Sequence, residues 1–504
     1  MQEELKRFTK EEALSDLYKL VKIITETHPD PFMNLGSQIK FYMMIDEIIG
    51  KINENIDIIE LYNITRKITA LIGDSHTFMQ NPGFDNSRIW IEFEIIDEKI
   101  IVLGVYEKNL NDIIGHELIA VNGINVKELL SKMHEIRASN SIYDALAHLI
   151  NAFYDKYTMS YITGQDGINY VNLTLMSIED NSLKDVKLSF SIDPPGALIE
   201  NNTVFNVKSK LDISYGIINN TGYLRIDSMT RYREAYESIL NFGADESFIR
   251  EMLAANGFES SGDIDKIISK IPSASESIIE LLSTMNKNNI NDIIIDLRNN
   301  RGGNSYLAYI LTYFLYGNKI YEMESGYDIE RYSSWYKNQY SKVNDIWFLG
   351  GYNFQEMHEW LSGNRKIDHD DWVETVNISK TFSAYYKKYH VQDNINVYAL
   401  CSARTFSAGF DLLDMLKRCG AIVIGIEPSQ AANAFINTIA FSLDNSGLKG
   451  NVSSKLMLKY PDKPMFYTIR PDIPINIKDF INHNWDANTI LIESINIIKQ
   501  NKNI

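Results

Sequence analysis

A serine at the junction between a strand and a helix is the first residue that could do chemistry. Val397 to Leu400 is a short apolar run, typical of a buried strand, and the apolar residues from Phe406 to Leu416 follow with helical spacing. Ser407 lies where the turn becomes the helix, beside backbone N–H groups that have no helical partner. A hydroxyl there could act as a nucleophile whose reaction develops an oxyanion. It could equally be an ordinary helix cap, since serine is a favoured capping residue.

A glycine-bearing loop follows a second buried strand. Ile293 to Leu297 is apolar enough to be covered on both faces of a sheet, and Asn299 to Gly303 then precede another helix. The paired glycines Gly302 and Gly303 would let backbone N–H groups point into a site without obstruction from a side chain. The alternative is a plain strand-to-helix turn. Because sites in α/β sheets form beyond the carboxyl ends of the strands, we expect this loop and Ser407 to meet at one edge.

A third motif near the start of the chain supplies a titratable group. Residues 73–77 read GDSHT and follow a helical stretch that ends near Leu71. His76 could be a general base, because imidazole changes charge near neutral pH. It could also be a histidine that only bridges the turn after the helix.

Together, these motifs resemble the tail-specific or C-terminal-processing serine peptidases. The resemblance rests on DLRNNRGGN, TFSAGFD and GDSHT, with NSGL at Asn445–Leu448 and RPDI at Arg470–Ile473, and it spans about Thr9 to Ile473. The branch that uses a serine–histidine pair, with tricorn-like and chlamydial secreted proteases, is the more similar one. The resemblance implies an α/β fold with a crotonase-like (ClpP/crotonase) catalytic core and an N-terminal helical region.

The resemblance also implies residue roles. Ser407 would attack the scissile carbonyl, and the oxyanion hole would use the Ala408 N–H with one from Gly302 or Gly303. Some members take their base from a lysine in a GEPxxGK context, but Ala432 stands about where that lysine would be. His76 is therefore the expected base, with Ser75 as a candidate accessory serine.

The acid that would orient His76 is not evident from the sequence. The serine–histidine branch places a glutamate shortly before the PDI stretch, and this chain has none there. Asp462, Asp472 and Glu427 are the candidate substitutes, and the sequence does not rank them. A weakened or inactive member that binds a peptide or another ligand is thus the alternative to a peptidase, and another acyl-transfer hydrolase is a third hypothesis.

The composition limits the classes of molecule that this protein is expected to bind. The 504 residues are 45% hydrophobic and carry a formal net charge of −17, which disfavours nucleic acid and anionic membranes and leaves polypeptide as the expected substrate. Cys401 and Cys419 form no metal motif, and the histidines have no metal-ligand spacing, so we expect neither metal nor cofactor. No signal peptide or membrane span is evident, which predicts a cytoplasmic protein unless another export route operates.

Periodicity divides the chain into four regions. We expect an N-terminal helical region at 1–80, a β-rich region with a PDZ-like fragment around Val121–Ile124 at 81–210, a catalytic core at 211–480 and a C-terminal helix at 481–504. Two insertions are expected in the core: amphipathic helices at 230–288, and a segment rich in Tyr and Trp at 320–392.

Overall fold

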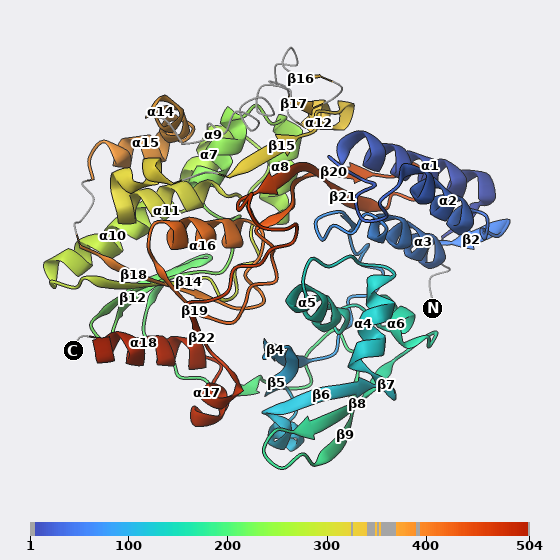
Figure 1. Cartoon of the computed structure of the whole chain (residues 1–504), viewed down its shortest axis with the longest axis horizontal. Coiled ribbons are helices and arrows are strands. Elements are labelled where there is room, and N and C mark those ends of the chain that lie inside the picture. The colour runs from blue at the N-terminus through green and yellow to red at the C-terminus, as the bar shows by residue number, and fades with distance from the viewer. Residues whose placement is uncertain are drawn as a thin grey trace.

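Three sheets, each with its own helices, form most of the molecule (Figure 1). The computed structural model describes residues 6–323, 326–339, 348–349, 352–353, 369–389 and 394–501. The chain is mixed α/β, in agreement with the expected class. Within the described residues, no helix combines the length and apolarity needed to cross a membrane.

The largest sheet lies in the C-terminal half and has the strand order β11-β12-β13-β14-β18-β19-β22. The strands from β13 to β22 are parallel, whereas β11 and β12 pair antiparallel. The bounds are Lys208–Lys210 (β11), Ile213–Ile218 (β12), Thr221–Ile226 (β13), Asp292–Asp296 (β14), Asn396–Cys401 (β18), Ile422–Gly425 (β19) and Ile473–Pro474 (β22). All five residues of β14 are buried, in agreement with the strand covered on both faces that its Ile293–Ile295 run predicts.

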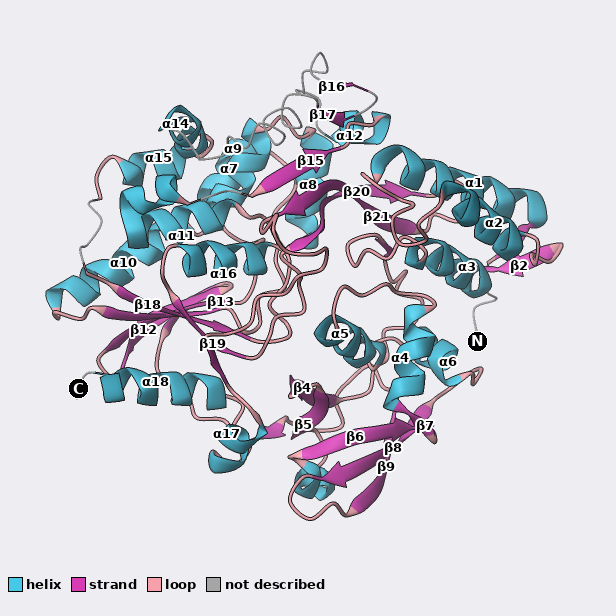
Figure 2. Cartoon of the chain, in the orientation of Figure 1, coloured by secondary structure: helices cyan, strands magenta, loops and turns pink. Residues whose placement is uncertain are grey.

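Helices cover both faces of this sheet (Figure 2). α10 (Ala274–Lys287), α11 (Tyr306–Tyr316) and α16 (Ala408–Arg418) pack on one face in the largest hydrophobic core. α18 (Thr489–Asn501) packs on the other face. The expected strand–turn–helix–strand unit is therefore confirmed as β18, α16 and β19, with parallel strands.

The first expected insertion consists of four helices. They are α7 (Arg233–Asn241), α8 (Glu246–Ala255), α9 (Ile264–Lys270) and α10. The second insertion is described in part, with η2 (Gly317–Glu322), β15 (Tyr327–Glu330), α12 (Ser334–Gln339), β16 (Phe348–Leu349), β17 (Tyr352–Asn353), α14 (His369–Asn377) and α15 (Lys380–Tyr386). Trp372 is fully buried and packs near Tyr313 and Phe382. Trp347 and Trp360 lie outside the described residues.

The N-terminal region is helical as expected. α1 (Lys10–Thr27), α2 (Gln38–Ile49) and α3 (Ile58–Ala70) share a core, next to the short pair β1 (Arg7–Thr9) and β2 (Asn55–Asp57). Thr9 and Glu12 form the predicted capping box. A long ribbon of β20 (Asn433–Ser442) and β21 (Lys449–Leu458) follows β19 and joins this helical core, where β3 (Phe78–Met79) pairs with β21.

The middle region holds the second large sheet. Its strands are β4 (Ile91–Ile96), β5 (Lys99–Val105), β6 (His116–Val121), β7 (Ile124–Asn125), β8 (Tyr170–Ser177), β9 (Leu183–Ser189) and β10 (Ile199–Glu200). α4 (Val126–His134), α5 (Ile142–Ala152) and α6 (Lys156–Thr163) pack with this sheet in one core, and η1 (Lys108–Ile113) connects β5 to β6. Asn122 and Gly123 form the expected turn, both with positive φ.

The C-terminal segment differs from the expected single helix. A short helix, α17 (Ile477–Asn482), precedes α18, and a turn separates them. The sequence predicts Asp486, a favoured capping residue, at the start of the final helix, but α18 begins three residues later, at Thr489. The Asp486 carboxylate instead accepts hydrogen bonds from Asn488 and Thr203, which ties the turn to the segment after β10.

Candidate active site

Ser407 has a backbone conformation that L-amino acids rarely adopt. Its φ is 52° and its ψ is −125°, and its side chain makes no capping hydrogen bond although it occupies the N-cap position of α16. An ordinary capping serine has extended backbone angles and bonds a helical N–H, so that alternative is wrong. Strain of this kind costs about 1–3 kcal/mol and persists where the surroundings enforce it, commonly at functional sites.

The turn that carries Ser407 is attached to the loop after β14 by three hydrogen bonds. The Ser402 hydroxyl donates to Arg298 O at 2.7 Å, and the Thr405 hydroxyl donates to Leu297 O at 2.8 Å. Phe406 N donates to Asn300 O at 2.9 Å. The two motif-bearing loops therefore meet at one edge of the sheet, as expected.

Glycines allow the two loops to touch. A Cβ on Gly302 would lie 2.6 Å from Ser407 Cβ and 2.9 Å from Ala408 N. A Cβ on Gly409 would lie 2.5 Å from Asn300 Oδ1. All of these distances are shorter than real Cβ contacts, so both positions require glycine because the two loops approach so closely. Gly302 has a second reason to be glycine, since its φ is 102°.

Two backbone N–H groups remain unengaged in the paired loops, at Ala408, which follows Ser407, and at Gly303, which follows Gly302. Within the described part of the chain, neither Ala408 N nor Gly303 N has a hydrogen-bond acceptor. Gly302 N differs, since it donates to Asn300 Oδ1 at 2.9 Å. Of the two glycines, Gly303 thus has the free donor.

Gln430 also contacts the Ser407 turn, and sequence reasoning missed it. Its side chain is buried, with Oε1 3.4 Å from Ser407 N and Nε2 donating to Ala431 O at 2.8 Å. The only signal was its place two residues before Ala432, in the segment where other members carry the lysine.

His76 reaches the site from the N-terminal region by stacking on Phe406, the residue before Ser407. The ring centroids are 4.7 Å apart and the planes differ by 22°. The His76 side chain is buried, and neither ring nitrogen has a hydrogen-bond partner among the described residues, so no bond to the Ser407 hydroxyl is formed in this conformation. Burial lowers the pKa of His76, although the negative charges of Asp74, Asp144 and Asp411 oppose this effect.

Asp74 is the carboxylate nearest to His76 in the same motif. Its Oδ1 lies 4.0 Å from His76 Nδ1 and accepts a hydrogen bond from His76 N. The other oxygen accepts from the Thr77 and Ser453 hydroxyls and lies 3.5 Å from His28 Nε2. Burial alone would raise the pKa of Asp74, but His28, the charge of His76 and the bond from Ser453 lower it to about 2.

Ser75 belongs to a hydrogen-bond network centred on Asp144. Its hydroxyl donates to Asp144 Oδ2 at 2.6 Å, and Asp144 Oδ1 lies 3.2 Å from His148 Nε2. Arg137 donates to Ser75 O at 2.8 Å and to His148 Nε2 at 3.3 Å. The GDSHT motif is thus fixed by α5 on one side and β21 on the other.

Comparisons with known proteins agree with this geometry. The model of Peptidase family S41 matches residues 220–475, about half of the chain, which include both loops. The chain belongs to peptidase family S41. It is therefore a serine-type peptidase, with polypeptide as its class of substrate.

Solved structures resemble this S41 peptidase over nearly its whole length. Mature CPAF has a TM-score of 0.60 at 13% identity over 96% of this chain and 98% of that chain. The structure of mature CPAF complexed with lactacystin has a TM-score of 0.59 at 14% sequence identity, and the match covers 97% of this chain and 98% of that chain. At this identity the likeness concerns the fold. No curated protein sequence matches the chain significantly.

The three acids considered from the sequence are bonded elsewhere in this S41 peptidase. Asp472 accepts from Lys417 Nζ at 2.5 Å and from Val423 N, which joins α16 to the sheet edge. Glu427 accepts from the Thr468 hydroxyl, and Asp462 pairs with Lys463. None of them bonds a ring nitrogen of His76, and the PDI segment forms the edge strand β22.

The lysines downstream of Ala432 are also engaged. Lys455 pairs with Asp328 at 2.8 Å, and Lys459 pairs with Asp411 at 2.9 Å and Asp414 at 3.5 Å. Burial alone would lower the pKa of Lys459, but the two carboxylates raise it above its usual range. Lys459 therefore stays protonated at neutral pH and is unsuited to act as a base.

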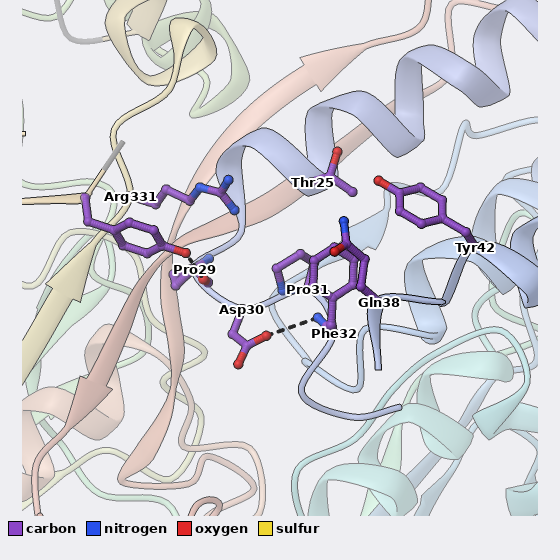
Figure 3. A pocket seen from close by; sticks show the side chains of 9 residues that line it. Thr25, Pro29, Asp30, Pro31, Phe32, Gln38, Tyr42 and Arg331 are labelled. Atoms are coloured by element: carbon purple, nitrogen blue, oxygen red, sulfur yellow. Dashed lines mark hydrogen bonds between the residues drawn. The ribbon is translucent and has the colours of Figure 1, made fainter. Parts of the chain in front are cut away.

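Two cavities lie near these motifs. One of about 630 Å³ includes Phe406, Arg301 and Arg404 in its lining. The other, about 510 Å³, lies at the His28–Phe32 turn, where Asp30 Oδ1 accepts from Phe32 N (Figure 3). Neither Ser407 nor His76 lines either cavity, but Phe406, the neighbour of Ser407, lines the larger one. In the described residues, no group of three His, Cys, Asp or Glu side chains is arranged to hold a metal.

Proposed function

We propose that this peptidase cleaves polypeptides with Ser407 as nucleophile and His76 as general base. The observation that carries the proposal is the strained Ser407 backbone at the start of α16, where the side chain makes no capping hydrogen bond and the N–H of the next residue, Ala408, is free among the described residues. A protein that only held a ligand on this fold would have no need of that strain.

The oxyanion hole is assigned to Ala408 N and Gly303 N. Both donors belong to loops that the Gly302–Ser407 contact fixes against each other, so they need no reorganisation when a tetrahedral intermediate forms. Asn300 has a supporting role, because its side chain accepts from Gly302 N and donates to Ile226 O at 3.0 Å.

His76 is suited to be a base because its lowered pKa keeps the ring neutral at physiological pH. Catalytic hydrogen bonds in unliganded enzymes are commonly long or broken, and they tighten when substrate binds. We infer that substrate binding brings a ring nitrogen of His76 to the Ser407 hydroxyl. Asp74 replaces Asp462, Asp472 and Glu427 as the proposed orienting carboxylate, on the basis of its 4.0 Å separation from Nδ1. Ser75 is assigned a positioning role through Asp144.

The finer fold assignment also belongs to this proposal. The parallel strands β13, β14, β18, β19 and β22, with α16 following the nucleophile turn, support a crotonase-like core. Most of the helices of residues 1–80, the sheet of 81–210 and the largest sheet of 211–480 belong to different hydrophobic cores, and the β20–β21 segment and its neighbours cross into the first of them. This supports the division of the chain into three domains and a C-terminal helical segment.

Covalent labelling tests the nucleophile. A fluorophosphonate probe should label the native protein at Ser407, as located by mass spectrometry of the modified peptide, and should leave Ser407→Ala unlabelled. Lactacystin, which is present in one CPAF structure, is a second probe. Labelling of another serine, or equal labelling of Ser407→Ala, would contradict the assignment, and heat-denatured protein serves as the control for non-specific reaction.

A further inference from the structure

Four arginines from separate parts of the chain line the 630 Å³ cavity beside the catalytic loops. Arg66 comes from α3, Arg137 from the segment after α4, Arg301 from the glycine loop and Arg404 from the turn before Ser407. Arg301 immediately precedes Gly302, and Phe406, which also lines the cavity, stacks on His76. Phe406 thus separates a group bound in this cavity from His76, and Phe406 is also the residue before Ser407.

None of the four guanidinium groups is paired with a carboxylate within the described residues. Arg66 donates to Thr158 Oγ1 at 2.6 Å and to Asn63, and Arg137 donates to Ser75 O and His148. Arg301 donates to Asn151 Oδ1 at 3.3 Å, and Arg404 donates to Phe93 O at 2.5 Å. Arginines elsewhere in the chain do form carboxylate pairs, namely Arg225, Arg231, Arg250, Arg298 and Arg418.

Burial makes this lack of carboxylate partners costly. Arg66 is only 5% exposed, and its Nε has no acceptor among the described residues. Burial lowers the pKa of Arg137 to about 10, and burial together with the charge of Arg404 lowers the pKa of Arg301. Arg404 differs, because burial alone would lower its pKa but the charges of Glu94, Tyr154, Glu92 and Glu200 raise it. The cost therefore falls on Arg66, Arg137 and Arg301. A desolvated cation without a counter-ion is unfavourable, and a bound anion would relieve that cost.

The acidic residues of the same cavity are already bonded. Asp144 accepts from Ser75 and from Asn140 N, and Asp155 caps α6 through Tyr157 N and bonds Thr158. Glu94 accepts from Ile95 N. His148 adds no charge at neutral pH, because burial lowers its pKa to about 4. The cavity thus has four cations against three acids, in a chain of net charge −17.

We propose that this cavity is a substrate subsite that binds a carboxylate of the polypeptide being cleaved. Guanidinium groups bind carboxylates through two parallel N–H···O bonds, which gives both affinity and orientation. Arg301, at the exposed mouth, meets the carboxylate first, and Arg404 lies beside it. The carboxylate belongs either to an Asp or Glu side chain near the scissile bond or to the C-terminus of the substrate. The proposal rests on the peptidase function proposed above.

Matched peptides separate the two sources. Fluorogenic peptides are compared as Glu and Gln pairs at each position flanking the cleavage site, and as C-terminal acid and amide pairs. We expect kcat/KM to be at least tenfold higher for one acidic member. Preference within a Glu/Gln pair identifies a side-chain carboxylate, and preference for the free acid over the amide identifies the C-terminus. Equal kcat/KM within every pair would overturn the proposal.

Arginine variants connect that preference to the cavity. Arg301→Gln and Arg404→Gln should reduce the acid-to-neutral ratio of kcat/KM at least tenfold, and Arg301→Lys should restore part of it. Arg250→Gln, which removes a paired arginine on α8, is the matched control and should keep the wild-type ratio. Circular dichroism verifies the fold of each variant. If folded Arg301→Gln and Arg404→Gln keep the wild-type acid-to-neutral ratio of kcat/KM, the preference for acidic substrates does not arise in this cavity and the proposal is wrong.

Binding to the Ser407→Ala protein makes the test independent of turnover. Fluorescence anisotropy should show tighter binding of the acidic peptide than of its neutral partner, and added salt should reduce the difference. If the wild-type protein shows neither labelling nor cleavage, the function proposal fails, while this measurement still decides whether the cavity binds carboxylates. Equal binding of both peptides would overturn the subsite.

Discussion

Gly302 and Ser407 are in such close contact that a Cβ on the glycine would lie 2.6 Å from the serine Cβ. The same Cβ would lie 2.9 Å from Ala408 N, a proposed oxyanion donor. The glycine loop (Asn299–Gly303) and the turn that carries Ser407 therefore form one structural unit, although they are more than a hundred residues apart in the sequence.

Gly302→Val should abolish most turnover. The new side chain would push Ser407 and Ala408 out of place, and losing one oxyanion donor typically costs about 2.7–4 kcal/mol in the transition state, about 10²–10³-fold in kcat. Gly420→Val is the control, because Gly420 has nearly the same φ, 106° against 102°, with no atom within 4 Å of its Cβ position. Steady-state kinetics of both folded variants give the kcat values to be compared. Equal kcat values would reduce Gly302 to a turn residue.

Ser407→Ala should lose hydrolysis while keeping its fold, since the hydroxyl makes no capping bond. Ser407→Gly should be equally inactive but more stable than the wild type by about 1 kcal/mol, because glycine adopts a φ of 52° without strain. Thermal or urea unfolding measures the difference. A glycine variant less stable than the wild type would contradict the strain argument, since that is the result for an ordinary cap.

The activity of the wild-type enzyme should fall on the acidic side as His76 becomes protonated. Because burial lowers the pKa of His76, the midpoint of this limb in kcat/KM should lie below about 6.5, with full activity above it. His76→Ala should be inactive across the range, whereas His134→Ala, an exposed histidine on α4, should keep the wild-type profile. A folded His76→Ala variant with normal turnover would exclude His76 as the base.

Asp74→Asn should move that acidic limb to still lower pH. The Asp74 charge raises the pKa of His76, so its removal lowers it further. Asp472→Asn removes a carboxylate that bonds Lys417 at the sheet edge, and its midpoint should not change. A pH–rate profile for each variant checks both statements. If the Asp74→Asn midpoint stays in place, Asp74 does not act on the base that limits turnover.

Asp74 should also stabilise the folded protein in a pH-dependent way. Its pKa of about 2 lies below the usual 3.8, so its contribution, about 2 kcal/mol, is present above pH 4 and is lost as the pH falls through 2. Asp74→Asn should therefore be less stable than the wild type at pH 7, and the gap should narrow in acid. Urea unfolding at several pH values measures the difference in unfolding free energy between the two proteins. A difference that does not depend on pH would contradict the lowered pKa of Asp74.

Short-range patterns in the sequence determined much of this protein. The apolar runs of β14 and β18, the helical spacing of α16 and the capping box at Thr9 and Glu12 are local signals, and each gives the element it predicts. Two strands that are parallel neighbours end at the same edge, so the meeting of their loops also followed from the sequence.

Only the tertiary structure decided which distant side chains surround that edge. The stacking of His76 on Phe406 depends on how the N-terminal helices pack against the β20–β21 ribbon. Asp472, next to the edge strand β22, bonds Lys417 and Val423 instead of His76, whereas Asp74 lies 4.0 Å from the His76 ring. The arginine cavity joins α3, α4, the glycine loop and the nucleophile turn. Such contacts arise from burial of whole surfaces, for which periodicity in a single segment carries no information.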